Sequence, residues 1–200
     1  MRLFVALCLH ADLHAVLGQV IEDLRLLDRR DQVRWVDPVG IHLTLKFLGE
    51  AGDERVPDLE AGLGAAVRGR QAPRLALGLL GAFPDLRRPR VLWIGLAEEE
   101  WSPGSGGCLA PLQEAVEAAT EALGWEREKR AFQPHLTLGR VREARGGGDL
   151  SLPPALLAAL GRSAPALPPG PLLRVALMQS HLSPAGARYE ERRAWELSLG

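Results

Sequence analysis

The tetrapeptide His-Leu-Thr-Leu occurs twice in this chain, as His42-Leu43-Thr44-Leu45 and as His135-Leu136-Thr137-Leu138. The chain has five histidines and three threonines. Chance placement would put a threonine two places after a histidine in about 0.08 cases, and short motifs deserve weight only when they exceed such noise. Side chains two residues apart in a β-strand share a face, so each His and Thr pair points one way and the leucines point the other. The repeat predicts two strands with matching polar faces, one in each half of the chain.

The rest of the sequence alternates between apolar runs of strand length and amphipathic stretches of helix length. The expected strands are residues 3–9, 33–36, 42–48, 75–79, 91–96, 135–141, 172–182 and 189–197. The expected helices are residues 12–28, 53–68, 109–123 and a short one at 154–160, with a Gly- and Ser-rich loop at 102–107. The second half repeats the order of the first. This pattern predicts an α+β fold of two similar lobes, forming one domain over residues 1–200.

Composition excludes several classes of function. The net charge of −1 supplies no global attraction to nucleic acid, so a nucleic-acid partner would need a local basic patch. Cys8 and Cys108 form no CxxC motif, which argues against a disulfide framework or a cysteine metal site and favours a reducing compartment. Residues 3–9 resemble a buried strand more than a signal peptide, and no run of about 18 apolar residues predicts a membrane span. The expected location is the cytoplasm.

The repeated residue types suit proton transfer at a phosphate. Imidazole both gives and takes protons near neutral pH, and hydroxyl donors bind non-bridging oxygens as negative charge develops. Two such strands facing each other across a groove would present two imidazoles and two hydroxyls to one phosphate. Lys46 has the same parity as His42 and Thr44 and is expected to add a cation to that face. No metal is needed for this chemistry. A single His-x-Thr would favour an ordinary polar strand, but the paired copy favours function.

The residues around the two copies resemble a known family. The matching segments are Arg2-Leu3-Phe4-Val5-Ala6, His42-Leu43-Thr44-Leu45-Lys46-Phe47-Leu48-Gly49, Arg90-Val91-Leu92-Trp93-Ile94-Gly95 and Phe132-Gln133-Pro134-His135-Leu136-Thr137-Leu138-Gly139-Arg140, and the likeness ends near Tyr189. Over nearly its whole length the chain resembles the bacterial and archaeal RNA 2′,3′-cyclic phosphodiesterases, also called 2′-5′ RNA ligases, of the two-histidine phosphoesterase superfamily.

The resemblance implies a bilobal α+β fold, in which two pseudo-symmetric lobes with antiparallel sheets enclose a central cleft. It implies that His42 gives a proton to the leaving oxygen and that His135 takes one from water. The implied product is a 2′-phosphomonoester, formed without a cofactor. Reverse joining of RNA ends, such as tRNA halves, is a secondary expectation.

Weaker signals lie near the second copy and elsewhere. Arg140 is expected to contact the phosphate backbone at the rim of the cleft. Phe83, Phe132 and Tyr189 are candidates for stacking on a base, with core or rim packing as the alternative. His10 and His14 have the spacing of metal ligands, but two histidines without further ligands are more typical of a solvated helix face.

Two rival functions stay open at this point. The first is a phosphodiesterase for a small cyclic nucleotide, such as ADP-ribose 1″,2″-cyclic phosphate, since the low net charge indicates no long RNA footprint. The second is a non-catalytic module that binds RNA ends or nucleotides, against which the intact histidine pair argues. The expected form is a monomer acting on RNA ends with a 2′,3′-cyclic phosphate.

Overall fold

The computed structural model describes residues 1–98, 107–142, 152–163, 170–183 and 186–199, so the expected loop at 102–107 lies almost wholly outside the described residues. The strands are β1 (Arg2–Cys8), β2 (Val33–Trp35), β3 (His42–Glu50), β4 (Arg74–Phe83), β5 (Val91–Glu98), β6 (His135–Val141), β7 (Gly170–Pro171), β8 (Arg174–Ser183) and β9 (Gly186–Glu196). The helices are α1 (Ala11–Leu27), α2 (Val56–Val67), α3 (Leu109–Ala122) and α4 (Pro154–Ala159), with 3-10 turns η1 (Pro38–Gly40) and η2 (Asp53–Arg55). Every predicted element is present, and β4 is longer than predicted.

The strands form one nine-stranded antiparallel sheet in the order β7-β4-β5-β6-β3-β1-β8-β9, with β2 paired to β6. One lobe holds β1, β3, β8 and β9, and therefore draws on both ends of the chain. The other lobe holds β2, β4, β5, β6 and β7. The two lobes meet where β3 pairs with β6. The fold is the predicted bilobal α+β arrangement with antiparallel sheets.

The relation between the two motif strands differs from the expectation. The sequence predicts that they face each other across a groove, but β3 and β6 lie side by side in the same sheet, joined at Leu43 and Leu136. This arrangement lets each strand satisfy backbone groups of the other, which would otherwise be left at a sheet edge. The two polar faces are consequently parts of one continuous surface, which we call the histidine face.

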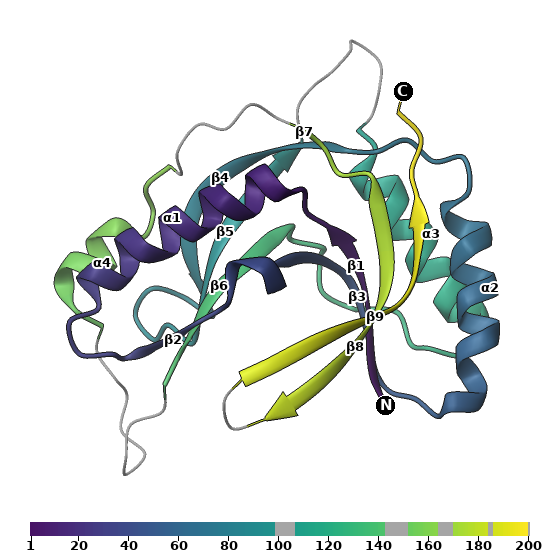
Figure 1. The fold of residues 1–200 in the computed structure, drawn as a ribbon, viewed down its shortest axis with the longest axis horizontal. Helices are drawn as coiled ribbons and strands as arrows, with labels where there is room; N and C mark the ends of the chain where they lie inside the picture. The colour runs from purple at the N-terminus through teal and green to yellow at the C-terminus, as the bar shows by residue number, and fades with distance from the viewer. Residues whose placement is uncertain (99–106, 143–151, 164–169, 184–185, 200) are drawn as a thin grey trace.

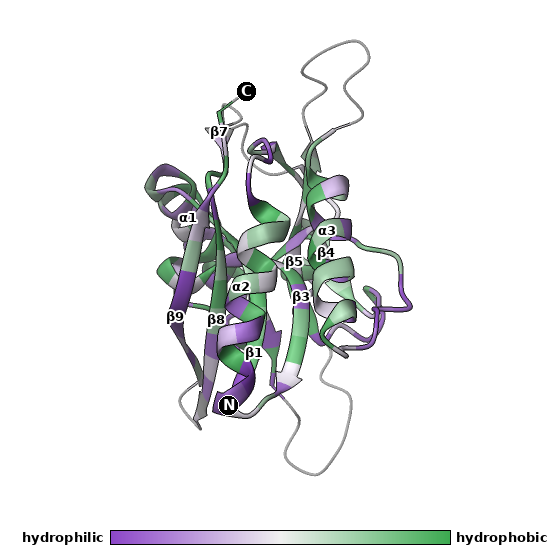
Figure 2. Cartoon of the chain, turned by 90° about the vertical axis from the view of Figure 1, so that its right-hand side faces the viewer, coloured by the Kyte–Doolittle hydropathy of each residue, from purple (hydrophilic) through white to green (hydrophobic). Residues whose placement is uncertain are grey.

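The helices cover the opposite side of the sheet. Helices α2 and α3 lie over the lobe that contains β1 and β3, and α1 and α4 lie over the lobe that contains β4, β5 and β6 (Figure 1). Figure 2 shows α2 and α3 in front of β1 and β3, with hydrophilic colour along the edge strand β9. Leu43 and Leu136 are both 0% exposed, so the leucines between each His and Thr do point into the core as predicted. No helix in the described ranges is both long and apolar enough to cross a membrane.

Strand β3 contains a β-bulge just after its His-x-Thr motif. Across β1 and β3, Val5 pairs with Lys46 and Ala6 pairs with Thr44, which leaves Leu45 as an extra residue on β3. A bulge of this kind resets the alternation of side chains between the two faces. The strand therefore turns Lys46 toward the core.

Strand β6 contains a bulge at the corresponding place. Across β5 and β6, Leu92 pairs with Gly139 and Trp93 pairs with Thr137, which leaves Leu138 as the extra residue. The two copies of the motif thus share a backbone irregularity three residues after each histidine. The pseudo-symmetry of the lobes extends to this detail.

The paired bulges return the fifth residue after each histidine to the histidine face. On β3 this residue is Phe47, which is 70% exposed and whose ring lies 6.2 Å from that of Phe4. On β6 it is Arg140, an exposed residue. Simple alternation from the motif would have assigned both positions to the core side.

Candidate active site

The pairing of Leu43 with Leu136 fixes the relative positions of the two histidines. Because the strands are antiparallel, each histidine lies beside the threonine of the other copy, and His42 and His135 occupy diagonal positions on one face. Diagonal neighbours in such a pair lie about 7–8 Å apart, with their Cβ atoms somewhat closer. That separation leaves space for a phosphate group between the two imidazoles.

Both imidazoles are oriented by the same backbone contact. The Nδ1 of His42 lies 2.9 Å from the Gly40 carbonyl oxygen, and the Nδ1 of His135 lies 2.7 Å from that of Gln133. A carbonyl oxygen only accepts, so in each ring Nδ1 carries the hydrogen and donates it. Nε2 is left free to exchange a proton with a bound molecule. The two rings therefore present equivalent reactive nitrogens.

His42 is enclosed by aromatic side chains. Phe4 stacks on its ring at 4.7 Å between centroids, and Tyr189 meets it edge-on at 4.9 Å. Burial lowers the pKa of His42 below the ordinary histidine value of 6.5, and the bond to the Gly40 carbonyl opposes this shift in part. Without a bound anion, the protein therefore favours the neutral form of His42.

His135 has a matching aromatic environment. Phe83 meets its ring edge-on at 4.9 Å, and Trp93 lies 6.3 Å away, with 5.1 Å between the Phe83 and Trp93 rings. Each imidazole thus lies against two aromatic rings that also contact each other, which restricts its orientation.

The predicted aromatic residues have different outcomes. Phe83 and Tyr189 both lie against a histidine, so the structure brings these two to the site. Phe132 is half-buried and packs against the core. Base stacking by Phe83 and Tyr189 stays a prediction. Sequence reasoning missed Phe4, which stacks on His42, and Trp93, whose ring lies farther from His135 than that of Phe83.

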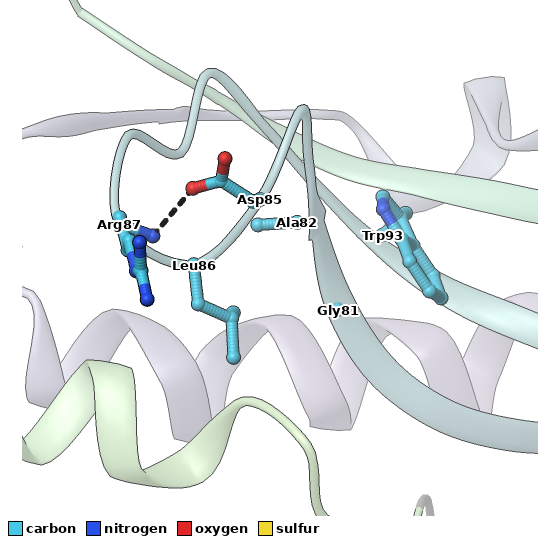
Figure 3. Close-up of a pocket in the computed structure, with 6 residues that line it drawn as sticks. All are labelled: Gly81, Ala82, Asp85, Leu86, Arg87 and Trp93. Atoms are coloured by element: carbon cyan, nitrogen blue, oxygen red, sulfur yellow. Dashed lines mark hydrogen bonds between the residues drawn. The ribbon is translucent and has the colours of Figure 1, made fainter.

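A pocket of 540 Å³ opens beside Trp93, the ring that also contacts His135 (Figure 3). Its lining residues are Gly81, Ala82, Asp85, Leu86, Arg87 and Trp93. The turn that forms its wall is held by Asp85, which accepts the backbone N–H of Arg87 at 2.7 Å. A Cβ at Gly81 would lie 2.4 Å from the Trp93 ring, so this glycine lets the indole pack flat against β4.

Lys46 does not lie on the histidine face. It is 5% exposed, and its ammonium group donates to the carboxylate of Glu117 on α3 and to the Glu126 carbonyl oxygen at 2.7 Å. The bulge at Leu45 is the physical reason, because it reverses the parity on which the prediction depended. The expectation that Lys46 adds a cation to that face is therefore wrong.

The other predicted polar residues do share the histidine face. Thr44 and Thr137 are half-buried and have the same parity as His42 and His135. Arg140 is brought to this face by the second bulge. Contact of these three residues with a phosphate stays a prediction.

The first two histidines of the chain have local structural partners. The Nδ1 of His10 accepts the backbone N–H of Leu13 at 3.3 Å and so caps α1, and the Nδ1 of His14 lies 2.7 Å from the Pro38 carbonyl oxygen. Within the described ranges, no three His, Cys, Asp or Glu side chains gather in a way that would hold a metal ion.

A paired set of oriented imidazoles on one sheet defines a two-histidine phosphoesterase. The model of the LigT-like phosphoesterase family matches residues 11–93 and 103–189, and the chain belongs to that family.

Relatives and solved structures agree with this assignment. The chain is 34% identical over 142 residues to the RNA 2′,3′-cyclic phosphodiesterase of Archaeoglobus fulgidus, covering 71% of this chain and 73% of the relative. It is 28% identical over 198 residues to the enzyme of that name from Methanothermobacter thermautotrophicus, covering 98% of each. A crystal structure from Thermus thermophilus superimposes with a TM-score of 0.72 at 28% identity, and E. coli LigT complexed with 3′-AMP with 0.65 at 25%, each covering 98% of both chains.

Proposed function

We propose that this protein opens 2′,3′-cyclic phosphates at RNA ends and leaves a 2′-phosphomonoester. His42 acts as the general acid and His135 as the general base, while Thr44 and Thr137 donate hydrogen bonds to non-bridging phosphate oxygens. The relatives named RNA 2′,3′-cyclic phosphodiesterase support the substrate class. The direction of ring opening rests on the resemblance of the two motifs to that family.

The observation that carries the proposal is the matched orientation of the two imidazoles. Each Nδ1 is committed to a backbone carbonyl, and each Nε2 is free on the same face of the sheet. Hydrolysis of a cyclic phosphodiester needs one proton removed and one delivered on opposite sides of phosphorus. A diagonal pair of free Nε2 atoms supplies both groups without a change in backbone conformation.

The proposed step balances with water as the second reactant. Nε2 of His135 takes a proton from water as its oxygen bonds to phosphorus. The bond between phosphorus and the 3′ oxygen breaks, and Nε2 of His42 gives its proton to that oxygen. The threonine hydroxyls stabilise the charge that builds on the non-bridging oxygens. Proton exchange with solvent then restores both imidazoles.

The lowered pKa of His42 bears on its assigned role. A general acid must be protonated, and burial opposes protonation in the free protein. A bound phosphodiester brings a negative charge next to the ring and favours the imidazolium. The substrate itself therefore helps to charge its own proton donor.

Joining of RNA ends uses the same groups in the same roles. If the 5′-hydroxyl of a second RNA replaces water, His135 removes its proton and a 2′-5′ linkage forms. We propose this joining activity, on ends such as those of tRNA halves, as secondary to hydrolysis.

The proposal is tested with an oligoribonucleotide that ends in a 2′,3′-cyclic phosphate, incubated with the protein in excess EDTA. We expect turnover to persist, because imidazoles supply both proton transfers, and the product to carry a 2′-phosphate resistant to a 3′-specific phosphatase. Loss of turnover in EDTA with recovery in Mg²⁺ or Mn²⁺ would show that the metal-independent mechanism is wrong. A 3′-phosphate as the main product would show that the ribose binds in the opposite sense.

A further inference from the structure

We propose that His14 is a positioning residue for His42 and acts through the η1 turn, which lies between the two in the chain. Its imidazole anchors the turn to α1 at Pro38, and the turn presents the Gly40 carbonyl that orients the His42 ring. His14 itself does not meet the reacting atoms. The inference rests on the proposed function, because it concerns how the assigned general acid is held in place.

The η1 turn aims the hydrogen-bond acceptor of His42. The turn ends at Gly40, and β3 begins two residues later at His42. The Gly40 carbonyl oxygen lies 2.9 Å from Nδ1 of His42. A Cβ at Gly40 would lie 3.7 Å from the ring of Tyr189, which meets His42 edge-on. A shift of the turn would therefore move the acceptor of the imidazole and disturb one of its aromatic neighbours.

Hydrogen bonds within η1 set its shape but not its position. The Asp37 carboxylate accepts the backbone N–H of Val39 at 3.1 Å, and the Asp37 carbonyl accepts that of Gly40 at 2.8 Å. Both bonds join residues of the same short segment. Asp37 is exposed and Val39 is 79% exposed, so burial of these two side chains does little to hold the turn. Its placement therefore depends on contacts with another element.

Helix α1 supplies those contacts from one face. The Nδ1 of His14 donates its hydrogen to the Pro38 carbonyl oxygen at 2.7 Å, since a carbonyl only accepts. Gly18 lies one helical turn later on the same face. A Cβ at Gly18 would lie 3.5 Å from Cγ of Pro38, so the proline ring packs on the helix where no side chain intervenes. One residue of the turn is thus held both by a hydrogen bond and by packing.

This contact joins elements that belong to different lobes. Helix α1 lies over the lobe that contains β6 and His135, whereas η1 leads into β3 and His42 (Figure 1). The two motif strands themselves pair at Leu43 and Leu136. The bond from His14 therefore adds a second tie between the lobes, at the point where the orientation of His42 is decided.

Loss of the His14 bond has a predictable effect on His42. Without it the turn gains freedom, and the bond between the Gly40 carbonyl and Nδ1 of His42 weakens. That bond raises the pKa of His42 and so opposes the larger lowering by burial. A weaker bond leaves the effect of burial less opposed. The pKa of His42 should then fall further, and its Nε2 should be less well placed to deliver a proton.

Two variants of similar size test the bond. His14→Asn keeps an N–H donor near the position of Nδ1, and His14→Leu removes it. We expect His14→Leu to lower kcat for an RNA end with a 2′,3′-cyclic phosphate on the order of tenfold, because a small misplacement of a reacting group slows its step. His14→Asn should recover most of this loss. His10→Ala is the matched control, since it removes the imidazole that caps the same helix at Leu13 and leaves the bond to Pro38 in place.

A pH titration of the His42 imidazole by NMR, without substrate, separates positioning from a general loss of stability. A smaller folded fraction would lower the rate equally at every pH and leave the pKa of His42 unchanged in the folded protein. We expect this pKa to be lower in His14→Leu than in wild type and close to wild type in His14→Asn and His10→Ala. The variants leave in place Tyr189 and Cys8, the titratable side chains that lie beside His42 on β9 and β1.

The titration also separates this inference from the proposed function. A lowered His42 pKa in His14→Leu, together with wild-type protein that opens no cyclic phosphate, would support the positioning role and overturn the proposed function. An unchanged His42 pKa in His14→Leu would overturn the positioning role, whatever the rate. Equal effects of His14→Leu and His14→Asn on both the rate and the pKa would also overturn it, because the hydrogen-bond donor would then be irrelevant.

Discussion

Replacing His42 or His135 by alanine is expected to lower kcat for an RNA end with a 2′,3′-cyclic phosphate by about 10²–10⁴-fold, the usual contribution of a general acid or base. Each ring has a free Nε2 on the histidine face, whereas His14, whose Nδ1 also lies against a backbone carbonyl, belongs to helix α1. The rate is measured with saturating substrate at fixed pH. His181→Ala is the matched control, because its imidazole bonds to Glu190 at 3.0 Å instead of lying in the site.

The double variant, in which both His42 and His135 are replaced by alanine, tests whether the two imidazoles act together. If both imidazoles act in one transition state, removal of the second should cost much less than removal of the first, so the losses should not multiply. Thr44→Ala and Thr137→Ala should cost less than either histidine, since each removes one neutral donor. Both histidine variants should still bind a 2′-phosphate-ended oligonucleotide within about tenfold of wild type, because the hydroxyls remain. Near-wild-type turnover by either alanine variant would contradict the acid–base pair.

Breaking the buried Lys46–Glu117 pair is expected to destabilise the fold by about 3–5 kcal/mol, because one charge is left buried without a partner. Lys46 and Glu117 are 5% and 4% exposed. Urea denaturation of Lys46→Met and of Glu117→Gln measures the free energy of unfolding. Lys46→Met leaves the Glu117 carboxylate without a cation, although Gln113 and the Glu128 N–H still donate to it. We expect replacement of both residues by apolar side chains to recover much of the loss.

An exposed ion pair gives the control for that experiment. Arg174 donates to Glu191 at 2.7 Å on the surface of the sheet, and its removal should cost no more than about 1 kcal/mol. A loss of that small size in Lys46→Met would contradict the structural role assigned to the buried pair. The pair matters to the site because the Glu126 carbonyl bound by Lys46 belongs to the segment that leads to His135.

The sequence predicts the face shared by each His and Thr correctly, because strand alternation is a local property. The core orientation of Leu43 and Leu136 follows from the same rule and is confirmed by their complete burial. The helices and strands are also predicted to within a few residues, except that β4 is longer than predicted and that β7 was not predicted. These successes depend on periodicity within one segment.

The prediction for Lys46 is wrong because the bulge in β3 interrupts the alternation of side chains between the two faces. A bulge depends on how a strand registers with its neighbour, and that register is set by tertiary pairing which no single segment encodes. The same event, repeated in β6, turns Arg140 to the histidine face. The sequence carries one indication of the bulge in β6. Gly139 occupies the position that corresponds to Lys46 in the first copy, and a side chain at Gly139 would collide with Val33.

The aromatic neighbours of the histidines could not be predicted from the sequence for a related reason. Phe4 reaches His42 because β1 pairs with β3, and Trp93 reaches His135 because β5 pairs with β6. Within their own strands both residues sit in continuous apolar runs, which are typical of strands buried on two faces. Strand order, which is non-local, decides that they line the site.

The pH dependence of turnover tests whether His42 and His135 form an acid–base pair. The rate should rise with pH as His135 becomes neutral and fall at higher pH as His42 loses its proton, giving a bell-shaped profile. Because burial lowers the pKa of His42, the alkaline limb should fall at lower pH in kcat/KM, which reports the free protein, than in kcat, where the bound anion favours the imidazolium.

Profiles of wild type, His42→Ala and His135→Ala, recorded with the same cyclic-phosphate-ended oligonucleotide, complete the measurement. We expect His42→Ala to lose the alkaline limb and His135→Ala to lose the acid limb. An unchanged bell-shaped pH–rate profile in the His42→Ala variant would contradict the role of His42 as general acid, because another group would then be donating the proton.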